Sequence, residues 1–475
     1  MNEAGFATLP SPVVEDELRQ WESNDTPQGA GDVGVRDLRA LLWSSIDNPS
    51  SRDLDQVEFA RREPDDTIRL LIGIADVDAF VPRGSATDQL AYQNTTSVYT
   101  GIETFPMLPR RLSEDLTSLL EGEDHLAVVV DMVIGADGAV QSRSVYRAQV
   151  RNRARLNYDA VGLWLEGRTD IPPEVAHTAG LEAQLRLQDE AADRLGDLRL
   201  QNGALDFETI EATPVIVEGT VVSLSVTPKH RARYLIENFM VAANNAVAEL
   251  LAAGSAPSIQ RVVRTPKRWD RITAIAASLG DPLPALPSAQ ALAGFLARRR
   301  AADPLRFPDL SLSVVKLLGA GEYAVVHAGE REEGHFGLAV QGYTHSTAPN
   351  RRYADLATQR LLKAAAASGP SPYTESDLEA IAARCTERAS AAQKVERTLR
   401  KAAAAVLLRG RIGDTFDALV TGASRKGTYV RLLHPPAEGR VMRGENGLDV
   451  GDAVRVRLLA ANPETGFIDF EALGG

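Results

Sequence analysis

Three aspartates lie within nine residues of the segment IDNPSSRDLDQ (residues 46–56), directly after an apolar run. A turn at the Asn-Pro pair can bring Asp47 back beside Asp53 and Asp55, which share one face if their segment is extended. Converging carboxylates repel one another, so such a site is expected to hold a hard cation, preferably magnesium or manganese, with calcium also possible. Taken alone, the spacing fits a metal site or a solvated acidic turn equally well.

A calcium-binding EF-hand loop is the main rival for this spacing. Asp47 and Glu58 fall at the first and twelfth positions of such a loop. Pro49, however, occupies a ligand position, and Arg52 stands where the loop needs glycine. The sequence therefore excludes an EF-hand.

A second unusual stretch is YTHSTAPNRRYADLATQRLL (residues 343–362), in which an arginine pair follows a proline and opens a predicted helix. We expect the two side chains and the free N–H groups of the first helical turn to converge on an anion. Arginine contacts phosphate through two donors at once, which lysine does not reproduce. Such a pair alone is usually surface charge, but beside an acidic metal cluster it indicates phosphoryl chemistry.

The elements that must position these residues follow from hydrophobic periodicity and turn residues. The periodicity predicts strands at 71–81 and within a hairpin at 126–150, and helices at 181–201, 231–254, 267–305, 351–368 and 375–408. From about residue 409, five short β-like segments with glycine-marked turns predict a small closed barrel of the OB type. We expect a partly irregular leader at 1–37, a catalytic domain at 38–408 and an OB-fold domain at 409–475.

Composition limits the class of protein. The 475 residues carry a net charge of −12, which argues weakly against nucleic-acid binding as a bulk property, although a buried channel depends only on local potential. Cys385 is the single cysteine, which excludes an internal disulfide framework and fits a cytoplasmic location. The sequence starts without a signal peptide, and no apolar run is long enough to predict a membrane span.

Taken together, the motifs resemble those of the RNB-domain exoribonucleases, the ribonuclease II and ribonuclease R type. The resemblance rests on IDNPSSRDLDQV, IGIADVDAFV, FPMLPRRLSEDLTSL, RARLNYDAV, GALDF, LIENFMVAAN and YTHSTAPNRRYADLATQRLL, which follow the family's order between residues 40 and about 400. It implies an α+β fold, with a catalytic domain of mixed sheet and helices enclosing an RNA channel, followed by a five-stranded RNA-binding barrel.

The resemblance also implies roles for individual residues. Asp47, Asp53 and Asp55 correspond to ligands of Mg²⁺ (Mn²⁺ possible), and Asp55 to the residue on which cleavage depends. Arg351 corresponds to the arginine at the scissile phosphate. The residues expected to bind RNA are Tyr99, Tyr158, Phe207, Arg352, Glu396, Phe416 and Tyr429. Aromatic rings can stack on any base, but each ring can equally be a core residue, and for Phe207 the two interpretations are balanced.

Three departures from the family pattern stand out. Gln56 replaces the fourth aspartate, so the metal site loses an anionic ligand. Ala348 and Asn350 alter the stretch before the arginine pair. Only 46 residues precede Asp47, which predicts a short form without the N-terminal cold-shock domains of the family.

These observations leave three functional hypotheses. The first is a magnesium-dependent hydrolytic 3′→5′ exoribonuclease that degrades single-stranded RNA to 5′-mononucleotides, with basic stretches such as TPKHRARY lining the channel or lying on solvated helix faces. The second is an RNA-binding protein of the same fold that Gln56 has catalytically weakened. The third is a metal-dependent phosphatase or nuclease that acts on a short or modified substrate. The sequence implies no membrane and no obligate protein partner.

Overall fold

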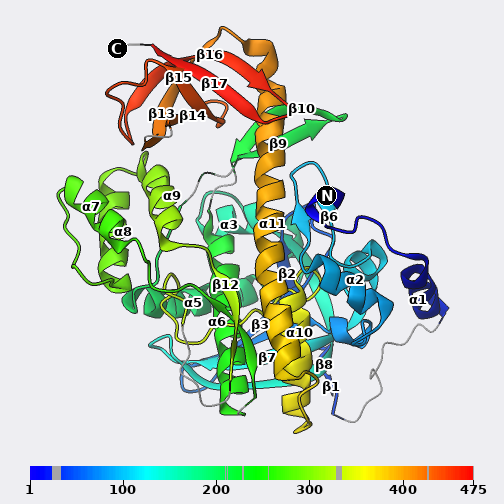
Figure 1. Cartoon of the computed structure of the whole chain (residues 1–475). Helices are drawn as coiled ribbons and strands as arrows, with labels where there is room; N and C mark the ends of the chain where they lie inside the picture. Colours follow the sequence, from blue (N-terminus) through cyan, green and yellow to red (C-terminus); the bar gives the residue numbers. More distant parts are fainter. Residues whose placement is uncertain are drawn as a thin grey trace.

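The computed structural model describes residues 1–23, 34–208, 210, 212–226, 229–254, 256–327, 334–424 and 427–473. It has the predicted α+β architecture: a mixed sheet covered by helices, with a β-barrel beyond it (Figure 1). No helix in these ranges is both long and apolar enough to cross a membrane.

The central sheet has the strand order β1-β8-β2-β3-β4-β7, and β8 also pairs with β7. The predicted hairpin is confirmed as β7 and β8. Residues 140–151 of β8 pair antiparallel with β7, and residues 152–157 pair parallel with β2. Because β8 pairs with β2 and also with β7, which are far apart in the strand order, the sheet curls around a core of mostly aliphatic buried side chains. The strands are β1 (Arg36–Asp37), β2 (Trp43–Asp47), β3 (Gln56–Arg62), β4 (Ile68–Ala75), β7 (Asp124–Ile134) and β8 (Val140–Asn157).

Helices α3, α5, α6 and α10 pack against this sheet. The predicted helices at 181–201 and 231–254 are confirmed as α5 and α6, and α6 is long and largely buried because its sequence is apolar on most faces. The helix bounds are α2 (Ala86–Asn94), α3 (Tyr158–Leu165), α4 (Pro173–His177), α5 (Leu181–Gln201), α6 (Arg231–Ala253), α7 (Trp269–Ser278), α8 (Ala289–Ala302), α9 (Phe307–Leu318), α10 (Tyr353–Ala366) and α11 (Glu375–Leu408).

Smaller elements complete the catalytic part. Two-stranded sheets are formed by β5 (Val98–Tyr99) with β6 (Thr104–Phe105), β9 (Ala212–Val217) with β10 (Thr220–Val226), and β11 (Ser258–Val262) with β12 (Glu322–Val326). Single turns of helix occur at η1 (Asn2–Ala4), η2 (Val77–Ala79), η3 (Leu112–Leu116) and η4 (Arg409–Arg411).

The first 23 residues are more ordered than the expectation of a partly irregular leader. Helix α1 (Pro12–Ser23) carries Glu17, whose carboxylate accepts the backbone N–H groups of Ala86 and Thr87 at 2.7 and 2.8 Å. Phe6 is buried, and the guanidinium of Arg388 lies over its ring. These contacts attach the segment to α2 and α11. The rest of the predicted leader falls partly outside the described residues.

The predicted C-terminal barrel is confirmed. Its closed strand order is β13-β14-β15-β17-β16, with bounds β13 (Thr415–Ser424), β14 (Gly427–Leu432), β15 (Glu438–Arg443), β16 (Ala453–Asn462) and β17 (Phe467–Leu473). Helix α11 runs from beside α10 to the barrel (Figure 1), and Ala405 and Leu408 at its end enter the barrel core. A buried ion pair between Arg431 and Asp309 joins the barrel to α9.

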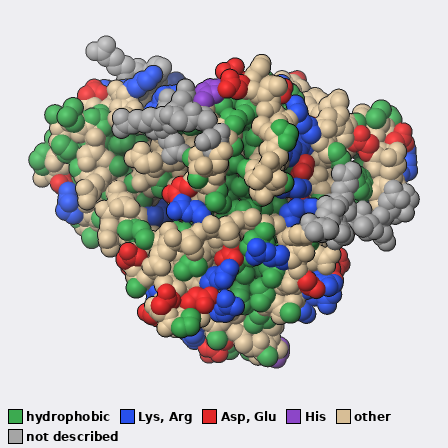
Figure 2. Space-filling model, turned by 90° about the horizontal axis from the view of Figure 1, so that it is seen from below, with side chains coloured by type: hydrophobic (Ala, Val, Ile, Leu, Met, Phe, Trp, Pro, Cys, Tyr) green, Lys and Arg blue, Asp and Glu red, His purple; other side chains and the backbone are tan. Residues whose placement is uncertain are grey.

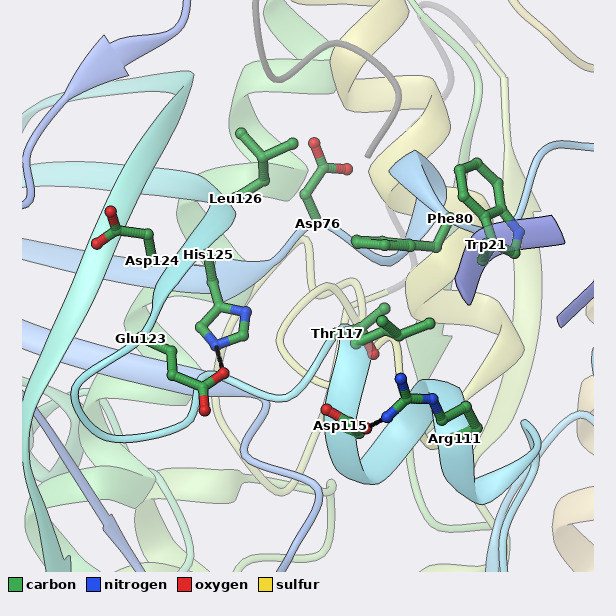
Figure 3. Close-up of a pocket in the computed structure, with 11 residues that line it drawn as sticks. Trp21, Asp76, Phe80, Arg111, Asp115, Thr117, Glu123, Asp124, His125 and Leu126 are labelled. Carbon is green, nitrogen blue, oxygen red and sulfur yellow. Dashed lines mark ion pairs between the residues drawn. The ribbon is translucent and has the colours of Figure 1, made fainter. Parts of the chain in front are cut away.

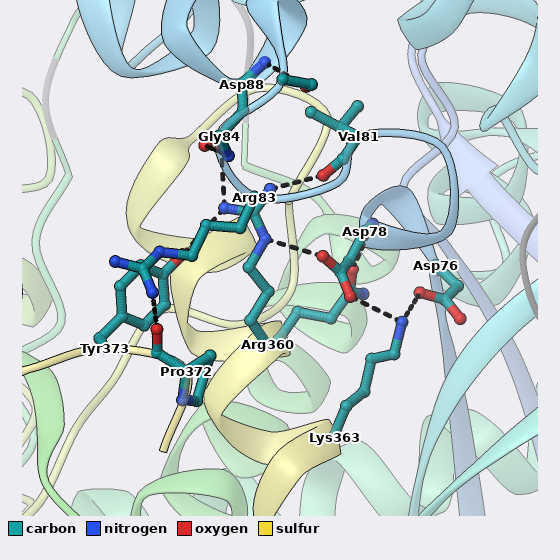
Figure 4. Close-up of polar contacts among 12 residues, drawn as sticks. Asp76, Asp78, Val81, Arg83, Gly84, Asp88, Arg360, Lys363, Pro372 and Tyr373 are labelled. Atoms are coloured by element: carbon teal, nitrogen blue, oxygen red, sulfur yellow. Dashed lines mark hydrogen bonds and ion pairs between the residues drawn. The ribbon is translucent and has the colours of Figure 1, made fainter. Parts of the chain in front are cut away.

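Helix α10, which follows the arginine pair, is fixed by a buried polar network (Figure 4). The guanidinium of Arg360 is almost fully buried and donates to Asp78 at 2.7 Å and to Asp88 and the Tyr373 hydroxyl at 2.8 Å. Lys363, one turn later, binds Asp78 at 2.8 Å. Because each charge has an opposite partner, the network holds the middle and the last turn of α10 at a fixed place.

Candidate active site

The aspartate segment lies at the edge where β2 ends and β3 begins. Asp47 is the last residue of β2, whereas Asp53 and Asp55 belong to an irregular loop, because β3 starts only at Gln56. The expectation that Asp53 and Asp55 share one face of an extended segment therefore stays a prediction, because neither residue belongs to a regular strand. The backbone of Leu54 is held instead by the N–H of Leu119 and the hydroxyl of Ser118.

The three carboxylates nevertheless lie within electrostatic range of one another. Asp47 accepts the N–H of Asn48 at 2.7 Å and the hydroxyl of Ser51 at 2.6 Å, which closes the predicted turn. Burial is the main cause that raises the pKa of Asp53, and the charge of Asp47 adds to it. The charge of Asp53 in turn raises the pKa of Asp55.

Asp55 is the most buried of the three, at 2% exposure. Its carboxylate accepts the backbone N–H of Asn350 at 3.1 Å and the Nε–H of Arg351 at 3.3 Å. Burial raises the pKa of Asp55 to about 7, although Arg351 and Asn350 oppose the rise. The two stretches singled out in the sequence, nearly 300 residues apart, thus meet at Asp55.

The arginine pair does not converge as predicted. Arg351 faces Asp55, while Arg352 turns inward and makes two hydrogen bonds of 2.7 and 2.8 Å to Asp355. Arg352 precedes the first turn of α10, so Asp355 neutralises its charge where it stands. Its contact with RNA stays a prediction.

The loop before α10 is held by polar side chains to which the motifs assigned no role. Asn244 of α6 accepts both the N–H and the hydroxyl of Ser346 and donates to the Tyr343 hydroxyl at 3.2 Å. Asn350 is fully buried and accepts the hydroxyl of Thr117. The sequence signal for the role of Asn244 is the asparagine pair in MVAANNAV, within the predicted apolar helix, because polar residues in a buried helix need hydrogen-bond partners.

Two of the predicted RNA-binding residues, Tyr99 and Glu396, contact each other, and Tyr99 also contacts Asp53. The Tyr99 hydroxyl donates to Asp53 at 3.2 Å, and its backbone N–H donates to Glu396 of α11 at 2.9 Å. The Tyr99 side chain is 41% exposed. The ring therefore stands at the open side of the aspartate loop, where a base could stack on it.

Tyr158, at the start of α3, borders the aspartate turn from the other side. The guanidinium of Arg233 lies 4.4 Å from the centre of its ring, and the same group donates to the Asn48 side chain at 2.8 Å. Arg233 lies in the basic stretch TPKHRARY, but the sequence offered no reason to place this arginine, among the others of the stretch, at the site. Arg233 thus adds a cation at the edge of the site.

The remaining aromatic predictions have different outcomes. Phe416 is 5% exposed within the barrel core, which contradicts its predicted stacking on RNA because neither ring face is accessible. Phe207 packs against a separate hydrophobic cluster of α7, α8 and α9, in favour of the packing interpretation. Tyr429 is 42% exposed on the barrel, so its stacking stays a prediction.

The chemistry of the donors fits a hard divalent cation, since the site offers carboxylate oxygens in a largely buried place. As the side chains stand, no three Asp, Glu, His or Cys residues in the described part of the chain share a point at metal-binding distance. Asp47, Asp53 and Asp55 would thus need to change rotamer to hold one ion together.

Two cavities have walls that contain none of the residues predicted for the site. One of about 680 Å³ is bounded by α5, α6 and α8 and includes Arg233 and Lys229 in its wall. The other, of about 280 Å³, has Trp21, His125 and Asp115 in its wall (Figure 3). On the face shown in Figure 2, acidic and basic side chains are interspersed, so the net charge is not gathered there into one patch.

Comparison with known families gives two matches. The model of the RNB domain matches residues 35–368, and that of the RNase II-type exonuclease C-terminal S1 domain matches residues 414–473. Ribonuclease R of Vibrio parahaemolyticus is 30% identical over 484 residues, which cover 92% of this chain and 56% of that protein. The chain therefore spans just over half the length of this relative.

Solved structures share the fold. Mycoplasma genitalium RNase R, in complex with ribose-methylated single-stranded RNA, has a TM-score of 0.87 at 22% identity, covering 99% of this chain and 76% of that one. Yeast Ssd1, described as a pseudonuclease, has a TM-score of 0.68 at 18% identity, covering 87% and 51%. The same architecture thus occurs in a ribonuclease and in a protein described as a pseudonuclease.

Proposed function

Since this chain belongs to the RNB-domain family, as its motifs predicted, we propose that it is a hydrolytic 3′→5′ exoribonuclease. It degrades single-stranded RNA to 5′-mononucleotides and depends on Mg²⁺, with Mn²⁺ as a possible substitute. The observation that carries the proposal is the meeting of Asp55 with Arg351 beside Asp47 and Asp53. Carboxylates that can hold a metal ion, together with a partly exposed arginine, are groups that can support metal-assisted hydrolysis of a phosphodiester.

Arg351 acts on the phosphate. Its Nε is engaged with Asp55, and its side chain is 41% exposed, so among the described residues the outer guanidinium nitrogens are left to donate to phosphate oxygens. Two parallel donors match a phosphate, and a cation already oriented by Asp55 needs little reorganisation as negative charge develops. The anchoring of α10 keeps that orientation constant.

Asp47, Asp53 and Asp55 would hold the cation, which when bound supplies Lewis acidity toward the phosphate and the attacking water. The burial of Asp55 favours this role, because negative charge in a poorly solvated place is unfavourable and a cation relieves that cost. Of the three carboxylates, Asp55 should gain the most from a bound cation, since it is the most buried and its pKa is raised to about 7.

Tyr99 and Tyr158 position the RNA end. Both rings border the aspartate loop, and Glu396 holds the backbone of Tyr99 in place. Stacking accepts any base, which suits an enzyme that degrades RNA without regard to sequence. Exposed Tyr429 on the barrel provides a further stacking surface for single-stranded RNA.

The test is release of mononucleotides from uniformly labelled single-stranded RNA by the full chain with Mg²⁺, separated by chromatography. The proposal expects 5′-nucleoside monophosphates from the wild type and none from Asp55→Asn or in EDTA. Glu63→Gln removes a carboxylate at the far end of β3 and serves as the matched control with wild-type release. RNA that is bound but stays intact would refute the proposal.

The catalytically weakened RNA-binding protein remains a second candidate. Gln56 in place of an acid favours it, as does the occurrence of the fold in a protein described as a pseudonuclease. It predicts a gel shift with RNA and no magnesium-dependent product.

A further inference from the structure

The N-terminal segment (residues 1–7) packs against the strand that carries Tyr99, and the chain begins beside β6 (Figure 1). Phe6 is 3% exposed and shares one buried cluster with Val98 of β5 and Ala392 of α11. Val98 directly precedes Tyr99, and successive residues of a strand point to opposite faces. Burial of Val98 in this cluster therefore directs Tyr99 outward, to the open side of the aspartate loop.

Strand β5 is too short to hold Tyr99 by its own pairing. It consists of Val98 and Tyr99, which pair with Phe105 and Thr104 of β6. Isolated two-stranded hairpins are at best marginally stable, and this one is shorter than an ordinary strand pair. The place of the Tyr99 ring therefore depends on what packs against β5.

The residues just before β5 are held from the side of the arginine pair. The N–H of Ser97 donates to the carbonyl oxygen of Arg351 at 2.9 Å, and the N–H of Tyr353 donates to that of Thr95 at 2.8 Å. This pairing ends two residues before Tyr99. The backbone of Arg351 thus has direct partners outside the N-terminal segment, whereas Tyr99 depends on the contacts of β5 itself.

The N-terminal segment is anchored on both of its sides. The side chain of Asn94 accepts the N–H of Ala7 at 2.8 Å and donates to the carbonyl oxygen of the same residue at 3.1 Å. The guanidinium of Arg388, on α11, donates to the carbonyl oxygens of Ala4 and Gly5 at 2.7 and 2.8 Å. These paired backbone groups fix the segment against β5 and α11.

We propose that Phe6 is a positioning residue for RNA binding: through Val98 it holds the Tyr99 ring where the terminal base of the RNA stacks. This inference rests on the proposed function, since it requires that Tyr99 stacks on RNA. Phe6 is buried and acts only through its neighbours. Because Arg351 is held by other contacts, the loss of Phe6 should weaken RNA binding and leave the chemical step almost unchanged.

The competing explanation is that Phe6 contributes to stability alone. In that case its removal lowers the melting temperature, and any loss of RNA affinity is the same whether or not Tyr99 is present. The effect of a positioning residue disappears when the ring that it positions has been removed. A double-mutant cycle between Phe6 and Tyr99 separates the two explanations.

The experiment measures binding of a short fluorescent single-stranded RNA to the full chain by anisotropy, in EDTA so that the RNA stays intact. We expect Phe6→Ala to weaken binding by about fivefold or more in the wild type, but by less than about twofold in the Tyr99→Ala background. Phe6→Leu keeps an apolar side chain and should recover most of the affinity. Val14→Ala also removes a buried contact, on α1 and outside the Phe6 cluster as described, and should leave binding unchanged.

Melting curves check that each variant is folded, and Arg388→Gln is a milder second variant that loosens the N-terminal segment without opening the core. The same cycle with Tyr99→Ala applies to it, so the test stands even where Phe6→Ala does not fold. With Mg²⁺, Phe6→Ala should raise KM by about fivefold or more and leave kcat within about twofold of the wild type.

Equal weakening in both backgrounds, or unchanged affinity of the folded variants, would overturn the inference while leaving the exoribonuclease proposal intact. A wild type that binds RNA and shows the expected cycle, but leaves RNA intact with Mg²⁺, would overturn the exoribonuclease proposal alone. Failure of the wild type to bind RNA would overturn both.

Discussion

Replacement of Asp55 by asparagine should abolish RNA degradation and, without metal, stabilise the protein at neutral and alkaline pH. The pKa of Asp55 rises from 3.8 to about 7 on folding, so the folded chain retains a proton that the unfolded chain has released. At about 1.36 kcal/mol per pKa unit, this difference corresponds to about 4 kcal/mol of lost stability at high pH.

The sign of the effect follows from proton binding. Below about pH 4 the carboxyl is protonated in both states, so wild type and Asp55→Asn should be about equally stable in EDTA. As the pH rises from about 4 to about 7, the wild type loses stability and the variant, which cannot titrate at this position, does not. Above about pH 7 the difference should be constant.

Urea unfolding in EDTA at closely spaced pH values measures this difference directly. Asp131→Asn is a suitable control, because Asp131 is a buried aspartate of β7 that is paired with Arg69 away from the site. A difference between wild type and Asp55→Asn that is independent of pH, or a variant less stable at pH 8, would refute the reasoning. The expected result would mean that the fold carries Asp55 at a cost to stability for the sake of catalysis.

Three further predictions address the reaction and the RNA contacts. Arg351→Lys should lower kcat by about 100-fold or more, because lysine keeps the charge but not the two parallel donors, and single-turnover kinetics at saturating RNA measure it; unchanged kcat would contradict the role of Arg351. Tyr99→Phe should keep RNA affinity while Tyr99→Ala loses about 1–3 kcal/mol of it in fluorescence anisotropy, and equal losses would show that the Tyr99 hydroxyl bound to Asp53, not the ring, contributes. Tyr429→Ala should weaken binding of long oligonucleotides but not of short ones that end before the barrel, and equal weakening of both would place Tyr429 outside the RNA path.

The parts of the fold that depend on local patterns could be predicted from the sequence. The β7–β8 hairpin follows from alternation around the turn GADGA, and α5 and α6 follow from apolar residues at helical spacing. The barrel follows from short strands between glycine-marked turns. In each case the signal lies within a few residues of the element itself.

The orientation of single side chains could not be predicted in this way. Asp53 and Asp55 lie outside the regular strand, and Leu119 and Ser118 bind the backbone of Leu54 between them, a contact that no local pattern reveals. Arg352 turns to Asp355 because a buried carboxylate one turn away is a nearer partner than an anion in solution.

Phe416 and Arg233 show the same limit. The sequence does not show whether an aromatic residue of a barrel strand points into the core or to solvent. Alternation divides the residues of a strand between two faces but does not show which face is the core. Arg233 reaches Tyr158 and Asn48 only because α6 begins beside the aspartate turn. Both outcomes depend on tertiary packing.

The most direct test of the central claim follows one single-stranded oligoribonucleotide carrying a label on its 5′ end and, in a parallel sample, on its 3′ end. The account predicts that, with Mg²⁺, the 5′-labelled RNA shortens through a ladder while the 3′-labelled RNA releases labelled mononucleotide at once. Asp55→Asn should show neither change. Internal cuts, release first from the 5′ end, or degradation that persists in Asp55→Asn would contradict the account.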